Sequence, residues 1–125
     1  MKINNLLSLC FISLFIISAS SCKKDTPKKA VTATDISNTE WGGTVSGTFL
    51  GFKITTTTIV KFTSANAGSY YYYDGATTPE QFNFTYTYSN WSGVATKANK
   101  STANFAYSSS TKKITFDGDE LSQSK

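Results

Sequence analysis

The sequence predicts an all-β protein: a single antiparallel meander of about seven short strands that closes as a small barrel or folds as a sandwich. Apolar and polar residues alternate with a period of two from Trp41 onward, and no helical period appears. The chain is 14% aromatic and rich in Thr and Ser, a composition that favours strands. Turn signals recur about every ten residues, which is too close for the crossovers of a parallel sheet. Such a sheet hides its edges as a barrel or a sandwich.

The first two expected strands form a hairpin around a turn at Leu50-Gly51. In the first strand, Trp41, Val45 and Phe49 share one face, and small polar residues alternate with them. The second strand covers 52–62 and continues the alternation. Period-2 alternation places one face of each strand toward a core.

Five further strands follow. A turn at 66–68 precedes a strand of four tyrosines, Tyr70–Tyr73, which sends two rings to each face. Asp74-Gly75 is a tight-turn signal, and the strand over 81–89 places its aromatic residues on one face. We expect weaker strands at 93–97, 103–107 and 113–116, the end of the core at Leu121, and a frayed segment over 122–125.

The N-terminus predicts export. Lys2 precedes an apolar run over 6–17, and the small residues 18–21 follow, as in a secretory signal peptide that is too short to span a bilayer. Ala19-Ser20-Ser21-Cys22 resembles the lipobox of a bacterial lipoprotein precursor. The resemblance implies cleavage between Ser21 and Cys22 and acylation of Cys22. Since Lys23 and not Asp follows, it also implies the outer membrane of a diderm envelope.

We therefore divide the chain into a signal peptide (1–21), a flexible lysine-rich tether (22–36), an all-β domain (37–121) and a frayed C-terminus (122–125). The domain has no disulfide to support it. Cys10 lies in the leader, and Cys22 would carry the lipid.

The domain also resembles the lipocalin-like lipoproteins of Bacteroidetes-type bacteria. The resemblance rests on Asn38–Gly43, Val60–Phe62, Gly68–Tyr70 and Phe84–Tyr88. It implies a β-barrel. The central ligand cavity of lipocalins is not carried over, because this domain is shorter and Thr39 stands where lipocalins have a glycine two positions before the tryptophan.

Composition argues against several functions. The chain has no histidine and no arginine, and over residues 32–121 six lysines face seven carboxylates, for a net charge of −1. Nucleic-acid binders present a basic face, so we expect no nucleic-acid partner. Without histidine or a usable cysteine, catalytic triads and zinc sites cannot form, and we expect neither an enzyme nor a cofactor.

The carboxylates allow two further interpretations. Residues 117–120, Asp-Gly-Asp-Glu, have oxygen ligands that suit calcium, but we expect a turn in which Gly118 has positive φ and no metal site. A glycosidase pair would need Glu40 beside Asp74 or Glu80, and no pattern brings them together.

The aromatic residues provide the candidate binding site. Tyr71 and Tyr73, with Trp91 on a nearby turn, are expected to form a platform for a glycan, a small apolar ligand or an envelope protein. The alternative is that these rings simply supply bulk to the two faces of the sheet. We expect a lipid-anchored, non-enzymatic binding module, or else an accessory subunit of an outer-membrane complex.

Overall fold

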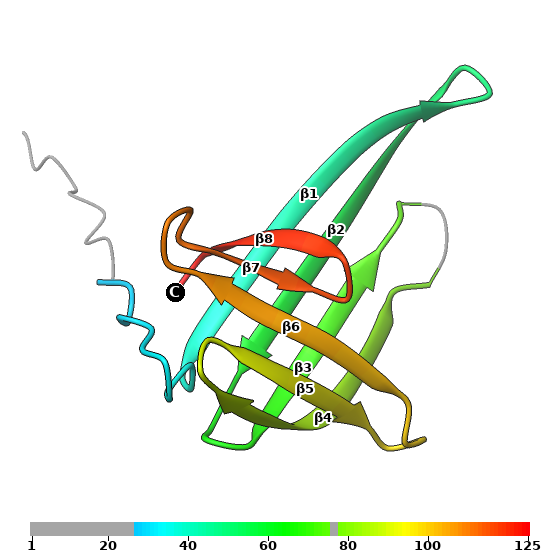
Figure 1. Cartoon of the computed structure of the whole chain (residues 1–125). Helices are drawn as coiled ribbons and strands as arrows, with labels where there is room; N and C mark the ends of the chain where they lie inside the picture. The colour runs from blue at the N-terminus through cyan, green and yellow to red at the C-terminus, as the bar shows by residue number, and fades with distance from the viewer. Residues whose placement is uncertain (1–26, 76–77) are drawn as a thin grey trace, which may run out of the picture.

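The protein, in a computed structural model that describes residues 27–75 and 78–125, is a closed antiparallel barrel (Figure 1). The all-β meander predicted from the sequence is confirmed, and the barrel is selected over the sandwich. Each strand pairs with the next, and β1 pairs with β8 to close the ring. The strands are β1 (Thr39–Phe49), β2 (Phe52–Phe62), β3 (Ala67–Tyr73), β4 (Glu80–Ser89), β5 (Ser92–Lys97), β6 (Thr102–Ser108), β7 (Lys113–Phe116) and β8 (Asp119–Gln123).

The structure has an eighth strand where the sequence indicated about seven strands and a frayed end. Asp117 and Gly118, with φ of 50° and 95°, form a two-residue turn that returns the chain along β7. The turn predicted there is thus confirmed, but the chain does not fray after it. The Ser124 N–H donates to the Glu40 carbonyl over 2.7 Å, so β1 holds the C-terminal residues. Strand β8 is short, with one hydrophobic residue, Leu121, and its alternation is too brief to read from sequence.

The barrel interior is filled by aromatic rings from five of the strands. Phe62 lies at the centre, with its ring centroid 4.9 Å from that of Tyr86, 5.0 Å from Phe105 and 5.9 Å from Phe84. Trp41 is fully buried. The other buried hydrophobic residues are Ile36, Val60, Ala95, Ala103, Ile114, Phe116 and Leu121.

Two glycines allow these rings to fit. A Cβ on Gly93 would lie 2.3 Å from the ring of Phe105, and a Cβ on Gly68 would lie 2.4 Å from that of Phe84. Real Cβ atoms do not approach so closely, so each ring packs directly on the backbone of a glycine.

Part of the predicted flexible tether packs on the barrel. Ile36 is 1% exposed, and Val31 packs against the core. The Lys29 ammonium donates to the Asp35 carboxylate and to the Ser37 carbonyl, both over 2.7 Å. We call residues 27–38 the arm; this segment has no periodic hydrophobic pattern, so the sequence does not predict the burial of Ile36. Residues 22–26 lie outside the described residues.

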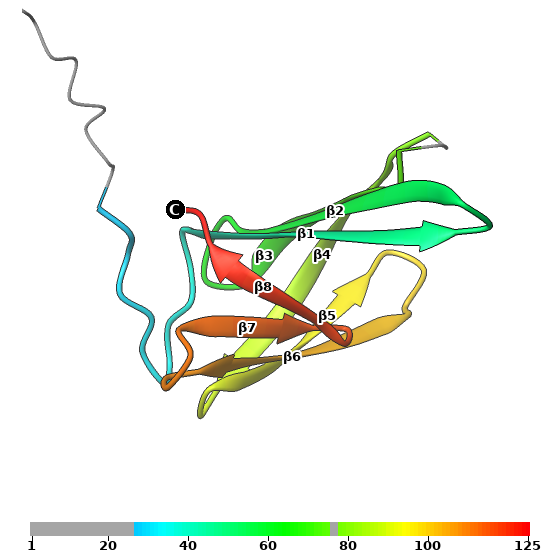
Figure 2. The same ribbon diagram turned by 90° about the horizontal axis from the view of Figure 1, so that it is seen from above.

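The barrel has two different ends. We call the end beside the arm, with the β2–β3, β4–β5 and β6–β7 turns, the arm end. The opposite end, with the other four connections, is the hairpin end, because there the β1–β2 hairpin extends well past its neighbours (Figures 1 and 2). Pairing of β1 with β8 stops at Gly42, and pairing of β2 with β3 starts only at Thr57.

Candidate functional site

The three residues predicted to form a binding platform do not come together. Tyr71 and Tyr73 pair with Ile59 and Thr57 of β2, and Tyr73 ends β3 at the hairpin end. Trp91 lies in the β4–β5 turn at the arm end. A joint platform of these three rings is therefore wrong, because the turn that carries Trp91 is at the other end of β4 from the end of β3.

Trp91 has a structural role instead. Its φ is 68°, unfavourable for a bulky residue. Its ring stacks on Tyr107 with centroids 5.4 Å apart. Its backbone N–H donates to the carbonyl of Ala33 in the arm over 3.3 Å, and its backbone carbonyl accepts from the Tyr107 backbone N–H over 2.8 Å. Trp91 therefore joins the arm to the barrel wall.

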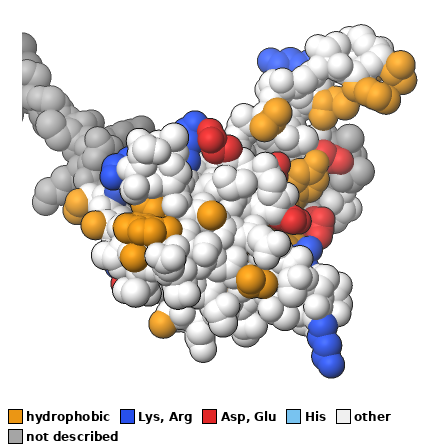
Figure 3. All heavy atoms as spheres, in the orientation of Figure 1, with side chains coloured by type: hydrophobic (Ala, Val, Ile, Leu, Met, Phe, Trp, Pro, Cys, Tyr) orange, Lys and Arg blue, Asp and Glu red, His pale blue; other side chains and the backbone are white. Residues whose placement is uncertain are grey.

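The apolar face of the β1–β2 hairpin is the most exposed hydrophobic surface in the described part of the chain. Five of the seven large hydrophobic side chains classed as exposed belong to this hairpin. They are Val45 (67% exposed), Phe49 (64%), Leu50 (82%), Phe52 (75%) and Ile54 (37%). Figure 3 shows them as an orange line along the projecting hairpin. Concentrated exposed apolar surface of this kind marks interaction sites.

This apolar face continues the inward face of the barrel. Val45 pairs with Thr56, and Phe49 pairs with Phe52, in the same register that pairs buried Trp41 with buried Val60. Beyond the rim, no strand of the described residues covers these positions, and the face that would line a core is exposed to solvent. A hollow of about 460 Å³ lies beside β2, and its lining includes Phe52 and Ile54 of this face, Thr55 of the opposite face, and Asp74 and Gly75. We call the surface formed by Val45, Phe49, Leu50, Phe52 and Ile54 the hairpin face.

The two ends of the barrel differ in charge among the described residues. The arm end carries Lys28, Lys29, Lys61, Lys112, Lys113 and Lys125, with the carboxylates of Asp35, Glu40 and, through its ion pair with Lys113, Glu120. The hairpin end carries the carboxylates of Asp74, Glu80, Asp117 and Asp119, with Lys53, Lys97 and Lys100. The ion pairs Lys29–Asp35, Lys61–Glu40 and Lys113–Glu120 neutralise these three carboxylates, and Lys28, Lys112 and Lys125 remain in excess. A basic arm end and a mildly acidic hairpin end result.

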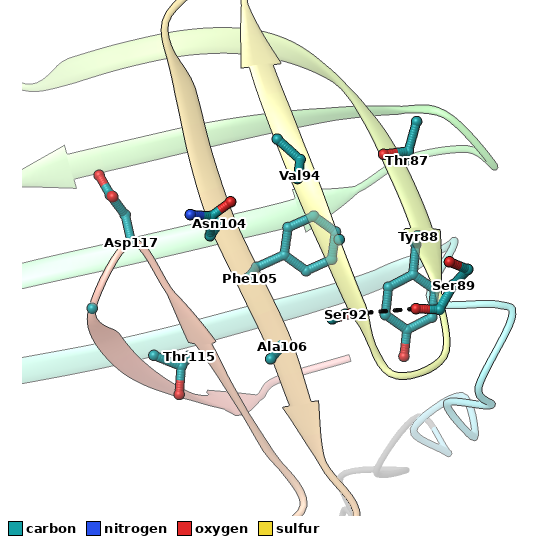
Figure 4. A pocket seen from close by; sticks show the side chains of 12 residues that line it. Thr87, Tyr88, Ser89, Ser92, Val94, Asn104, Phe105, Ala106, Thr115 and Asp117 are labelled. Carbon is teal, nitrogen blue, oxygen red and sulfur yellow. Dashed lines mark hydrogen bonds between the residues drawn. The ribbon is translucent and has the colours of Figure 1, made fainter.

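A second hollow lies on the outer wall of β4–β7 (Figure 4). Its volume is about 640 Å³, and its lining includes Thr87, Val94, Asn104, Thr115 and Asp117. Gly93, which has no side chain, is also part of the lining. Its groups are mainly hydroxyls and an amide, and they offer polar contacts but no nucleophile paired with a base.

The described titratable groups form no catalytic constellation. Burial raises the pKa of Tyr86 and of Tyr88 to about 12, and their hydroxyls donate to the carbonyls of Ser64 and Thr32. Both phenols therefore stay protonated. Glu40, at the arm end, lies at the other end of the barrel from Asp74 and Glu80, so the glycosidase pair is not assembled. Within the residues described, no group of three potential metal ligands occurs.

Comparisons with known proteins leave the family open. Scans against protein-family models, curated proteins and solved structures each returned no match. The resemblances to lipoproteins and to lipocalins therefore stay predictions. Among residues 27–75 and 78–125, no helix is long and apolar enough to cross a bilayer.

Sequence reasoning found the hairpin and missed its exposure. The alternation placed Val45 and Phe49 with Trp41 on one face, and the structure confirms that shared face. What differs is the packing: Trp41 is buried, and the other two are not. One signal was available. The expected strand over 52–62 is longer than every strand expected after it, which indicates that the outer part of this hairpin has no partner strand.

Proposed function

We propose that this protein is an exported lipoprotein of the cell envelope, anchored through Cys22, that acts as a non-enzymatic binding module. The observation that carries the binding role is the hairpin face, where large apolar side chains stay exposed beyond the rim of the barrel. A filled interior moves any ligand to the outside, since the rings of Phe62, Phe84, Tyr86 and Phe105 contact one another across the barrel. The binding surface is then the projecting hairpin and not a lipocalin-type cavity.

The charge of the barrel supports the proposed orientation. The arm leads back toward Cys22 and lies at the basic end, where lysines favour an anionic bilayer surface. Anchoring from this end would hold the hairpin face away from the membrane. The hairpin is therefore available to partners in the periplasm or outside the cell.

The alternative is an accessory subunit of an outer-membrane protein complex. The hairpin face favours it as well, because a docking element of a permanent complex also exposes apolar side chains in the isolated subunit. Stoichiometric co-purification with one envelope protein would favour the accessory-subunit hypothesis. Reversible, substoichiometric binding would favour the binding-module hypothesis.

Replacement of Cys22 by Ala tests the anchor. We expect the wild-type chain to fractionate with the outer membrane and to begin at an acylated Cys22, and the variant to be soluble or to keep its leader. Intact-mass analysis of the N-terminus reads this directly. An unacylated wild-type N-terminus, or membrane retention of the variant equal to wild type, would contradict the proposal.

Replacement of Phe49 and Phe52 by Ser tests the binding surface. Cross-linking in intact envelopes should give adducts of the wild-type chain that the double variant loses. Val94→Ser is the matched control, because Val94 is also an exposed hydrophobic residue but lies on the barrel wall. Equal adducts from all three chains would exclude the hairpin face as the binding surface.

A further inference from the structure

We propose that the outer half of β1, Thr44–Phe49, binds an extended segment of a partner protein that carries lysine or arginine beside alternating apolar residues. The segment would add to the barrel as a strand. This inference rests on the proposed binding function and names the partner chemistry of the same hairpin.

The free edge of β1 is the first observation. Strand β8 pairs with β1 only at Trp41 and Gly42. It still touches β1 at Gly43, where an added Cβ would lie 2.8 Å from the Leu121 side chain, and then diverges toward the β7–β8 turn. Beyond that point β1 has β2 on one side and no described strand on the other. Extended segments add to such edges through backbone hydrogen bonds.

The side chains along this edge are the second observation. Val45 and Phe49 lie on the hairpin face, and Gly47 lies between them. Nothing stands within 4 Å of an added Cβ at Gly47, so a large apolar side chain of the added strand has room beside it. Thr44, Ser46 and Thr48 form the opposite face. The edge therefore matches a strand that alternates apolar and polar residues.

Charge complementarity is the third observation. The wedge between β1 and β8 opens beside the β7–β8 turn. There the Asp119 carboxylate accepts from the Thr58 hydroxyl over 3.4 Å, and Thr58 pairs with Gly43, so this carboxylate lies where the outer half of β1 begins. Asp117, in the same turn, lines the hollow on the outer wall. Between residues 41 and 60, the only charged residue is Lys53, on the other strand of the hairpin. A segment in the wedge meets the Asp119 carboxylate at its barrel end, and basic residues there would be attracted.

The same observations disfavour two other occupants. A second copy would bring an identical acidic turn to the same edge, so the two turns would repel each other. An anionic bilayer would face the carboxylates of the hairpin end. An extended basic and apolar segment satisfies both the edge and the charge.

A peptide pair tests the proposal on the full chain held in phosphatidylcholine nanodiscs. The probe is a fluorescein-labelled peptide of alternating valine and threonine residues, with two lysines at each end. The control peptide has glutamate in place of each lysine. We expect saturable binding of the lysine peptide, at least about tenfold weaker binding of the glutamate peptide, and slower amide hydrogen exchange across Thr44–Phe49.

Variants separate the contributions. Val45→Ser with Phe49→Ser should abolish binding, and Val94→Ser should leave it unchanged. Asp117→Asn with Asp119→Asn should weaken the lysine peptide about three- to tenfold and bring the two peptides closer in affinity. Asparagine tolerates the positive φ of residue 117.

Other outcomes would overturn the proposal. These are no binding, equal affinity for both peptides, or binding without slower exchange at Thr44–Phe49. A dimer whose exchange is already slow without peptide would assign the edge to a second copy. Quenching of a Leu50→Trp reporter by brominated phosphatidylcholine would assign the hairpin to the bilayer. The Cys22→Ala result is read separately, so failure of the anchor and failure of strand addition can be told apart.

Discussion

The inner and outer halves of the β1–β2 hairpin have the same alternation and opposite surroundings. Near the arm end, Trp41, Val60 and Phe62 are fully buried among rings from other strands. Beyond the rim, Val45 and Phe49 on the same face are about two-thirds exposed. The difference comes from the neighbours, because β8 and β3 pair only with the inner half. Alternation therefore defines a face, and the reach of the adjacent strands decides whether that face becomes core or binding surface.

The largest expected effect contrasts two phenylalanines on one face of β2. Phe62→Ala should lower the free energy of unfolding by about 3–5 kcal/mol, because it removes a buried ring from the centre of the core. Phe52→Ala should cost under ~1 kcal/mol, since Phe52 is 75% exposed. Urea denaturation of both variants measures the contrast. Similar losses would mean that the outer half of the hairpin packs on something in the isolated chain.

A pair of glycines gives the next largest effect. Gly93→Ala should destabilise the fold by roughly 1–3 kcal/mol, because the new methyl would lie 2.3 Å from both the Phe105 ring and the Thr87 carbonyl oxygen. Gly47→Ala on the outer half has nothing within 4 Å and should be neutral or stabilising by up to ~1 kcal/mol. Thermal melts of the two variants should therefore move in opposite directions or differ clearly in size. A large loss at Gly47 would reveal an unseen contact on the hairpin face.

The smallest effect concerns the arm, which packs on the barrel core at the end opposite the outer half of the hairpin. A hydrogen bond from Lys29, which has the largest effect, and hydrogen bonds from Ser37 lower the pKa of Asp35 to about 2, below the usual value of 3.8. A lowered pKa means that the ionised carboxylate stabilises the docked arm above about pH 4 and that this contribution is lost as the pH falls toward 2. The carboxylate is half exposed, so the effect is modest.

Amide exchange at Ser37, whose N–H donates to the Asp35 carboxylate over 2.8 Å, should therefore become faster as the pH falls through this range, after correction for intrinsic rates. Asp35→Asn serves as the control and should show fast exchange without this pH dependence. A pH-independent difference between the two chains would contradict the role of the carboxylate. Exchange in Thr44–Phe49 should be unaffected, because the arm lies at the other end.

Much of the fold could be predicted from the sequence, since local signals determine it. Alternation located the hairpin and the aromatic strand β4, and Gly118 located the last turn. What could not be predicted depends on contacts distant in sequence. The arm packs through Ile36, which has no periodic neighbours, and β8 closes the barrel through only two pairs with β1.

The candidate site was harder to predict for the same reason. Tyr71, Tyr73 and Trp91 are close in sequence, but strand β4 separates Trp91 from the end of β3 by the length of the barrel. The exposure of Val45 and Phe49 depends on where β8 turns away, and nothing local to β1 encodes that position.

Residue-resolved amide hydrogen exchange of the chain without any partner tests the central claim most directly. If the outer half of β1 packs on nothing else in the chain, Thr44–Phe49 should exchange at least about tenfold faster than Thr39–Gly43, because only local opening of the hairpin is needed. Uniformly slow exchange along the whole of β1 would contradict the account, since it would mean that the hairpin face is already covered.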